Sequence, residues 1–311
     1  MALLEKALGP RHADVGTALS TLANIRRAQG NYPEAERLFR RALAITEHTF
    51  GPKSDETAAV LNDFAVLYKF MGRFNEAGRF YRRALAITVK TKGPDHPEVA
   101  TLYHNLGGLE HARGRFKRGE PYARRSVAIR EKALGHDHPE LAADLAALAA
   151  LLDGQGHYQE SEPLYRRALA IFERAFGPDH YEISFILNNL AAVRYAQGDA
   201  AQALALYRRA LAIKRRVLSP AHPDLALTLN NMGAAAKALR KFRTAEKLYR
   251  DALAVFTKAL EPGHPRLTAC VENLIQLFSD TGRLREAQVL KRRLEKNPAA
   301  ASRSASRFRR S

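Results

Sequence analysis

The sequence is built on a repeat with a period of 42 residues, which runs without insertion or deletion and limits the folds that the chain can adopt. Its turn column is Gly9, Gly51, Gly93, Gly135, Gly177, Ser219 and Glu261, and its glycine column is Gly30, Gly72, Gly114, Gly156, Gly198, Arg240 and Gly282. A third column is always small: Ala35, Ala77, Gly119, Ser161, Ala203, Ala245 and Ala287. A fixed period of this length is the mark of a repeat architecture, in which each unit packs on its neighbours.

Each unit is predicted to form two helices. In residues 177–218, apolar side chains recur at helical spacing from Ile183 to Val193 and again from Ala203 to Ile213. Gly198 separates the two stretches, at a position where a helix commonly ends in a left-handed residue. One helical pair cannot bury its apolar stripe, whereas stacked pairs can. The predicted fold is therefore all-α: a right-handed superhelical solenoid of about seven helix-turn-helix repeats.

The predicted solenoid covers residues 1–296, with units that start near residues 9, 51, 93, 135, 177, 219 and 261. Residues 1–8 align with the end of a second helix and are interpreted as the end of a truncated preceding repeat. Residues 297–311 lack apolar periodicity and carry four arginines, which predicts a disordered basic tail. Arg240, which stands in the glycine column, predicts a turn that is more strained or longer than its equivalents.

At this level of detail the sequence resembles the tetratricopeptide repeat family. Leu190-Ala191, Gly198, Ala203, Tyr207 and Ala210 stand where that motif has its Leu-Gly, glycine, alanine, aromatic and alanine. The 42-residue unit, with Leu-Asn-Asn-Leu-Ala at 187–191 and Arg-Arg-Ala-Leu-Ala-Ile at 208–213, is similar to the kinesin light chain subclass. The resemblance implies a protein-binding solenoid. It does not imply the motor role, because the long N-terminal heptad helix of kinesin light chains is missing.

The amino-acid composition limits the cellular location and the kind of partner to be expected. No stretch approaches the roughly 20 apolar residues of a membrane span, and the single cysteine excludes an intramolecular disulfide, so a cytoplasmic protein is expected. Fifty Lys and Arg against 32 Asp and Glu give a formal net charge of +18. This balance favours an acidic partner.

No catalytic, metal or cofactor site is predicted. Equivalent histidines of the repeat are His96, His138, His180, His222 and His264. They lie at least one interhelical distance apart, roughly 8–10 Å, and cannot share a zinc ion that needs ligands at about 2.0 Å. They are interpreted as turn residues, and Cys270 as a buried structural thiol. The strings typical of phosphate loops, zinc proteases and serine hydrolases do not occur, so the chain is predicted not to be an enzyme.

The inner face, lined by the first helix of each unit, is the preferred candidate for a binding site. Amide side chains recur there, and an amide can both donate to and accept from an extended peptide backbone. The predicted peptide-binding residues are Asn62, Lys69, Asn105, Asn188, Asn189, Tyr195, Asn230, Asn231 and Lys237. In proteins that this chain resembles, such asparagines hold the target peptide, which applies best to residues 188, 189, 230 and 231. Ala146 and Ala147 interrupt the series, and the lysines would favour an acidic peptide.

Two alternatives remain at this stage. The second helix of each unit carries arginine pairs opposite its apolar stripe, which could form a ridge for nucleic acid or another polyanion. The residues are Arg82, Arg83, Arg124, Arg125, Arg166, Arg167, Arg208 and Arg209. This partner is less favoured, because no surface for stacking bases accompanies them. The repeats could also be the sensor portion of a larger signalling protein. The sequence leaves open the identity of the partner and the oligomeric state.

Overall fold

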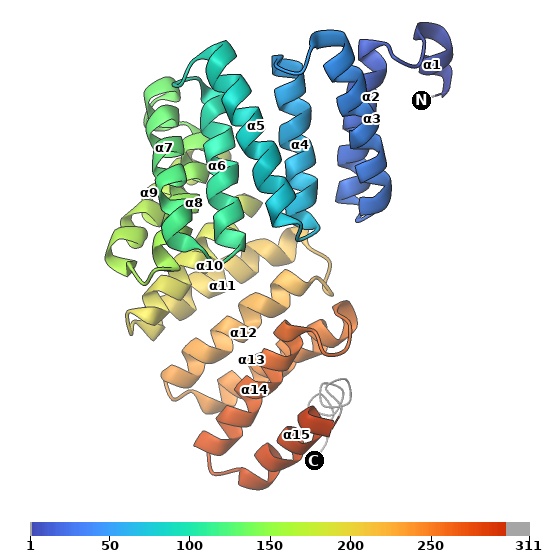
Figure 1. The fold of residues 1–311 in the computed structure, drawn as a ribbon. Helices are drawn as coiled ribbons and strands as arrows, with labels where there is room; N and C mark the ends of the chain where they lie inside the picture. Colours follow the sequence, from blue (N-terminus) through green and yellow to red (C-terminus); the bar gives the residue numbers. More distant parts are fainter. Residues whose placement is uncertain (1, 297–311) are drawn as a thin grey trace. The chain divides into compact units, whose positions relative to one another are not determined.

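The computed structural model describes residues 2–296, and in this range the chain forms helices and connecting turns without a strand. α1 stands alone, and α2–α15 form seven helical hairpins (Figure 1). We call the first helix of each hairpin helix A and the second helix B. The helices are α1 Ala2–Leu8, α2 Ala13–Ala28, α3 Tyr32–Phe50, α4 Asp55–Phe70, α5 Phe74–Lys92, α6 Pro97–Ala112, α7 Phe116–Leu134, α8 Pro139–Asp153, α9 Tyr158–Phe176, α10 Tyr181–Ala196, α11 Ala200–Val217, α12 Pro223–Ala238, α13 Phe242–Ala259, α14 Pro265–Asp280 and α15 Leu284–Lys296.

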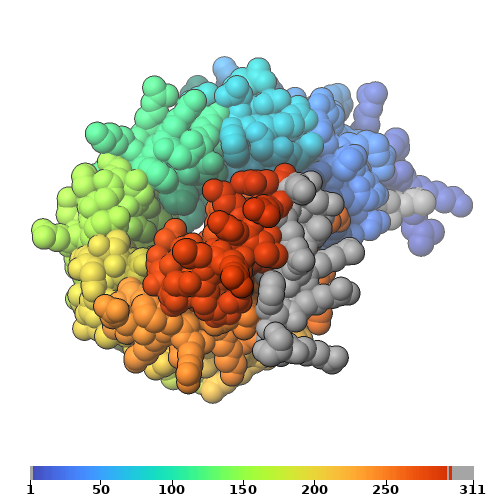
Figure 2. Space-filling view, turned by 90° about the horizontal axis from the view of Figure 1, so that it is seen from below, coloured from blue at the N-terminus to red at the C-terminus, as the bar shows by residue number. Residues whose placement is uncertain are grey.

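The chain divides into two compact units, Met1–Glu160 and Ser161–Ser311. In the first unit, from α2 to α8, each helix packs on the next one along the chain, and each A helix also contacts the following A helix, as α2 contacts α4. In the second unit α10 packs on α11 and α12, and this order continues through α15. Figure 2 shows that neighbouring hairpins within a unit are in side-chain contact, for example from blue to green in the first unit. The predicted all-α repeat solenoid is confirmed.

The turn histidines begin the A helices. In six of the seven A helices a histidine is the N-cap, and its ring accepts a hydrogen bond from the backbone N–H two residues later, as in His96 to Glu98 at 3.2 Å. Proline follows this histidine at the start of α6, α8, α12 and α14. An N-cap acceptor satisfies a backbone donor that has no partner within the helix. The role of the histidines is therefore local and structural.

The glycine column ends the A helices in a left-handed turn. Its glycines all have positive φ, and Arg240 adopts the same conformation with φ 56°. The Arg240 turn keeps the hydrogen-bond pattern of its equivalents, from the Lys241 N–H to the Ala236 carbonyl. Arg240 is thus a non-glycine residue in a strained region, as expected, but the turn is not longer.

The core follows the repeat columns. The small column is buried throughout, and the tyrosines at the centre of helix B, such as Tyr81 and Tyr249, are almost fully buried. At Gly233 the helices approach so closely that a Cβ atom would lie 2.6 Å from the Tyr249 ring. Over the described residues, no helix is long and apolar enough to cross a membrane.

Candidate binding surfaces on helices A and B

The amides of the first unit bind one another along successive A helices. The Asn105 amide nitrogen donates to Asn62 Oδ1 at 2.8 Å, and Asn62 in turn donates to Asp63 at 3.3 Å. Asn24 donates to the second oxygen of Asp63 at 2.7 Å. These side chains brace neighbouring hairpins. Asn62 keeps one donor and one lone pair, because an amide offers two donors and two acceptor sites.

The equivalent amides of the second unit are less completely paired. Asn188 exchanges hydrogen bonds with the Thr228 hydroxyl at 3.2 and 3.3 Å, and Asn230 accepts from Asn273 at 3.0 Å. Asn189 is exposed and Asn231 is half-buried, and neither side chain has a hydrogen-bond partner within residues 161–296.

The predicted basic residues of the inner face differ in their partners. Lys237 forms an ion pair with Asp280 at 2.9 Å, so the structure already supplies its counter-ion. Lys69 is half-buried above Gly108, and no carboxylate lies within ion-pair distance in the described part of its unit. Burial lowers the pKa of Lys69. The remaining candidate, Tyr195, exposes 39% of its surface.

Many of the arginines on helix B hold the repeats together. Arg83 donates to Glu47 at 2.6 Å and to the Pro52 carbonyl at 3.0 Å, and Arg209 makes the equivalent pair of contacts in the second unit, with Glu173 and Pro178. Further ion pairs join Arg124 to Glu120, Arg125 to Asp95 and Arg166 to Glu162, and Arg167 also has a partner. Arg82 and Arg208 are exposed and form no ion pair in the described chain. The candidate ridge is therefore much less charged than its arginine content indicates.

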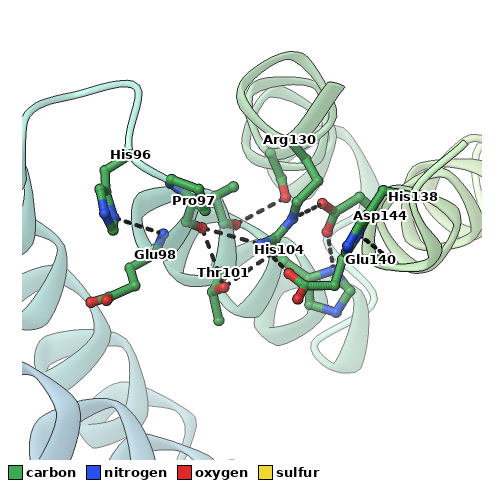
Figure 3. Close-up of polar contacts among 11 residues, drawn as sticks. His96, Pro97, Glu98, Thr101, His104, Arg130, His138, Glu140 and Asp144 are labelled. Atoms are coloured by element: carbon green, nitrogen blue, oxygen red, sulfur yellow. Dashed lines mark hydrogen bonds and ion pairs between the residues drawn. The ribbon is translucent and has the colours of Figure 1, made fainter. Parts of the chain in front are cut away.

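A buried ion-pair cluster in the first unit was not predicted. Arg130 of α7 donates to Asp144 of α8 at 3.0 Å, with 6% and 1% of the two side chains exposed (Figure 3). It also donates to the Thr101 hydroxyl at 3.1 Å and contacts Glu140. His104 binds the second oxygen of Asp144 at 2.7 Å. The two buried charges, those of Arg130 and Asp144, match each other, so this cluster is a structural element between three helices.

Comparison of equivalent positions in the repeats could have predicted this cluster. The column of Arg130 otherwise contains Thr46, Thr88, Phe172, Lys214 and Phe256. The column of Asp144 is mostly apolar. A cation and an acid that break two core columns in adjacent helices indicate a buried pair.

The same position in the second unit holds a cation without an acid. Lys214 is 1% exposed, and its ammonium donates to the Thr228 hydroxyl at 3.1 Å and lies 5.3 Å from the centre of the Phe185 ring. Burial lowers the pKa of Lys214, and the charge of Asp224 partly opposes this effect. Thr228 replaces Asp144, and Phe185 replaces Thr101.

The described residues give no support to catalysis by a thiol or a metal. Cys270 is fully buried, and burial raises the pKa of its thiol to about 12. A thiol in this state is a poor nucleophile. Among residues 2–296, no group of three or more His, Cys, Asp or Glu side chains is placed to hold a metal ion.

Fold and surface together define the class: a helical-hairpin repeat protein whose polar side chains lie along the faces of its helices. The family model described as tetratricopeptide repeat matches at residues 1–48, 14–88, 56–118, 98–174, 154–216, 182–258 and 224–296. The chain therefore belongs to the tetratricopeptide repeat family, and it is a protein-interaction scaffold of a kind that is generally non-catalytic.

Solved structures show the same fold. BtubC (BKLC) from P. vanneervenii is 23% identical with a TM-score of 0.60, over 75% of this chain and 92% of that one. A putative kinesin light chain from Podosopora anserina, with nearly identical TPR-like repeats, is 24% identical with a TM-score of 0.56, over 66% and 97% of the two chains. PilW, a type IV pilus biogenesis factor, is 20% identical with a TM-score of 0.59, over 82% and 97%. No curated protein matches the sequence.

Proposed function

We propose that the chain holds an extended, acidic segment of a partner protein along the A helices. The observation that carries this proposal is the pair Asn189 and Asn231, which occupy the same position in successive repeats of the second unit without internal hydrogen bonds. Two free amides in a regular row can each donate to and accept from a peptide backbone.

The preference for an acidic segment rests on the first unit. Lys69 is a half-buried cation without a carboxylate partner, and Arg27 lies in the same column, where it contacts Asn24 and the Phe70 ring but forms no ion pair. A carboxylate that approaches Lys69 would regain part of the charge stabilisation that burial removes. Lys237 contributes less, because Asp280 already neutralises it.

The test compares three proteins in affinity capture from a lysate of the source cell after nuclease treatment. The combined change Asn189→Ala and Asn231→Ala is expected to abolish retention of the partner at unchanged melting temperature, since these side chains contribute no internal hydrogen bond. The combined change Gln202→Ala and Gln288→Ala removes two exposed amides from B helices of the same unit, α11 and α15, and is the matched control. Equal retention by all three proteins would refute the inner-face proposal.

The alternative is a polyanion binder that uses the arginines of helix B. Arg82 and Arg208 support it, because both are exposed without ion pairs. Binding to an oligonucleotide would then weaken steeply with salt and after Arg82→Glu plus Arg208→Glu. Insensitivity of that binding to these two changes would exclude this version.

A further inference from the structure

Two basic pockets recur one repeat apart in the first unit. The first is lined by Pro10, Arg11, Arg41, Ala44, Ile45 and His48. The second is lined by Pro52, Lys53, Arg83, Ala86, Ile87 and Lys90. Each residue of the second pocket lies 42 positions after its counterpart, so the two are the same structural site. Neither lining contains an acidic residue or a Phe, Tyr or Trp side chain, and the imidazole of His48 in the first pocket is the one aromatic ring in the two linings.

Elsewhere in the chain, an aspartate occupies this site. Asp95, Arg125 and Lys132 correspond by the repeat to Lys53, Arg83 and Lys90. Asp95 bridges the two cations, at 3.0 Å from Arg125 and 2.7 Å from Lys132. The ion pair and hydrogen bond with Lys132, followed by Arg125, lower the pKa of Asp95.

The second unit repeats this arrangement. Asp179 stands at the same position of its repeat and pairs with Arg216, which corresponds to Lys132. The site between the Gly-Pro turn and helix B thus accepts a carboxylate in two separate repeats, each time with a cation from the end of helix B.

In the second pocket the local charges also favour an anion. Glu47 and the Pro52 carbonyl contact a single nitrogen of Arg83, Nη2, and so hold its guanidinium in place. The three cations Lys53, Arg83 and Lys90 outweigh the single carboxylate of Glu47. The methyl groups of Ala86 and Ile87 line the same pocket and reduce its contact with water, which strengthens a charge interaction.

We propose that the pocket of Lys53, Arg83 and Lys90 binds an aspartate or glutamate side chain of an acidic partner protein, and that the pocket of Arg11, Arg41 and His48 binds a second one. The partner's carboxylate takes the place that Asp95 takes within its own repeat. An acidic protein is favoured over single-stranded nucleic acid, because the pocket of Lys53, Arg83 and Lys90 offers no aromatic ring for base stacking and the other pocket offers only the imidazole of His48. This site lies on helix B and is independent of the proposed inner-face site.

The test uses a fluorescein-labelled hexaglutamate peptide and fluorescence anisotropy at low salt. Lys53→Asp places a carboxylate where Asp95 has its own, and it is expected to weaken peptide binding about fivefold or more while the melting temperature is retained. Arg37→Asp changes the net charge equally at an exposed residue of α3 that lines neither pocket, and it is the matched control. Asp95→Lys converts the third site into a basic pocket and is expected to strengthen binding.

The outcomes separate the possible sources of binding. Equal losses for Lys53→Asp and Arg37→Asp would show attraction by net charge alone and overturn the proposal, as would a Lys53→Asp protein that binds like wild type. An oligothymidine that binds more tightly than the peptide, with the same sensitivity to Lys53→Asp, would replace the acidic protein by nucleic acid as the partner. Because Asn189 and Asn231 are absent from the pockets, their double variant should bind hexaglutamate normally even if the inner-face proposal fails.

Discussion

Arg130 and Lys214 occupy the same position of the repeat, in the first and second unit respectively, yet their surroundings are opposite. Arg130 is neutralised by Asp144, which is 1% exposed. Lys214 meets the neutral hydroxyl of Thr228 instead, and burial lowers its pKa. One backbone site can therefore hold a matched ion pair or a buried cation without an ion-pair partner, depending on a residue 14 positions later in the next hairpin.

The largest effect is expected from Asp144→Asn, which removes the buried acid and leaves Arg130 in place. Glu140 retains part of the charge match, but the loss of a buried partner should still reduce the free energy of unfolding by about 3 kcal/mol. Urea unfolding followed by circular dichroism measures this change.

A double variant tests whether the unpaired charge of Arg130 causes this loss of stability. Arg130→Thr with Asp144→Leu installs the residues of the preceding repeat, Thr88 and Leu102, which are both buried there. We expect its stability to lie within about 1 kcal/mol of wild type, because no unpaired charge remains. A double variant as unstable as Asp144→Asn would show that packing, rather than charge, decides the loss.

A smaller effect of opposite sign is expected from Lys214→Met. Methionine keeps the unbranched stem and removes the uncompensated ammonium, so the free energy of unfolding should rise by about 1–2 kcal/mol at neutral pH. Thr228→Asp is the complementary variant, since it supplies the acid that Arg130 has and should also stabilise. Destabilisation by Lys214→Met would mean that the contacts with Thr228 and Phe185 outweigh the cost of burial.

The pH dependence of that difference tests the charge directly. An unfolded lysine has a pKa of about 10.4, and the folded pKa of Lys214 is lower, so the unfolded state binds more protons between the two values. The cost is fully present below the folded pKa and disappears as pH rises toward the unfolded pKa. The advantage of Lys214→Met should therefore shrink as the pH rises toward about 10.4, the pKa of an unfolded lysine. A difference in stability that stays constant as the pH approaches this value would contradict the lowered pKa of Lys214.

The smallest effect is expected from His104→Asn, which gives the first unit the residue found at the equivalent position 188. Asp144 keeps its bond to Arg130, and the new amide can donate to the oxygen that His104 binds. The free energy of unfolding should change by less than about 1 kcal/mol. A loss above about 2 kcal/mol would make His104 a necessary member of the cluster.

Most of the fold was predictable because each repeat encodes it locally. The turn histidines, the glycine column and the small column act within one hairpin, so their spacing along the chain is sufficient to place them. The candidate binding site was harder to predict from the sequence. Whether Asn62 or Asn231 is already paired depends on a side chain in a neighbouring hairpin, about one period away.

The amino-acid sequence alone specifies the repeat, its two helices per unit and the residue type at every position of the helical faces. The tertiary structure decided which of these charges and amides are available to a partner. It matched Lys237 with Asp280 but left Lys69 without an acid, and it paired Arg83 with Glu47 beside a pocket that also contains Lys53 and Lys90. The physical reason is that helical periodicity is a local property, whereas a charge is neutralised or exposed only by the groups that folding brings within a few ångströms of it.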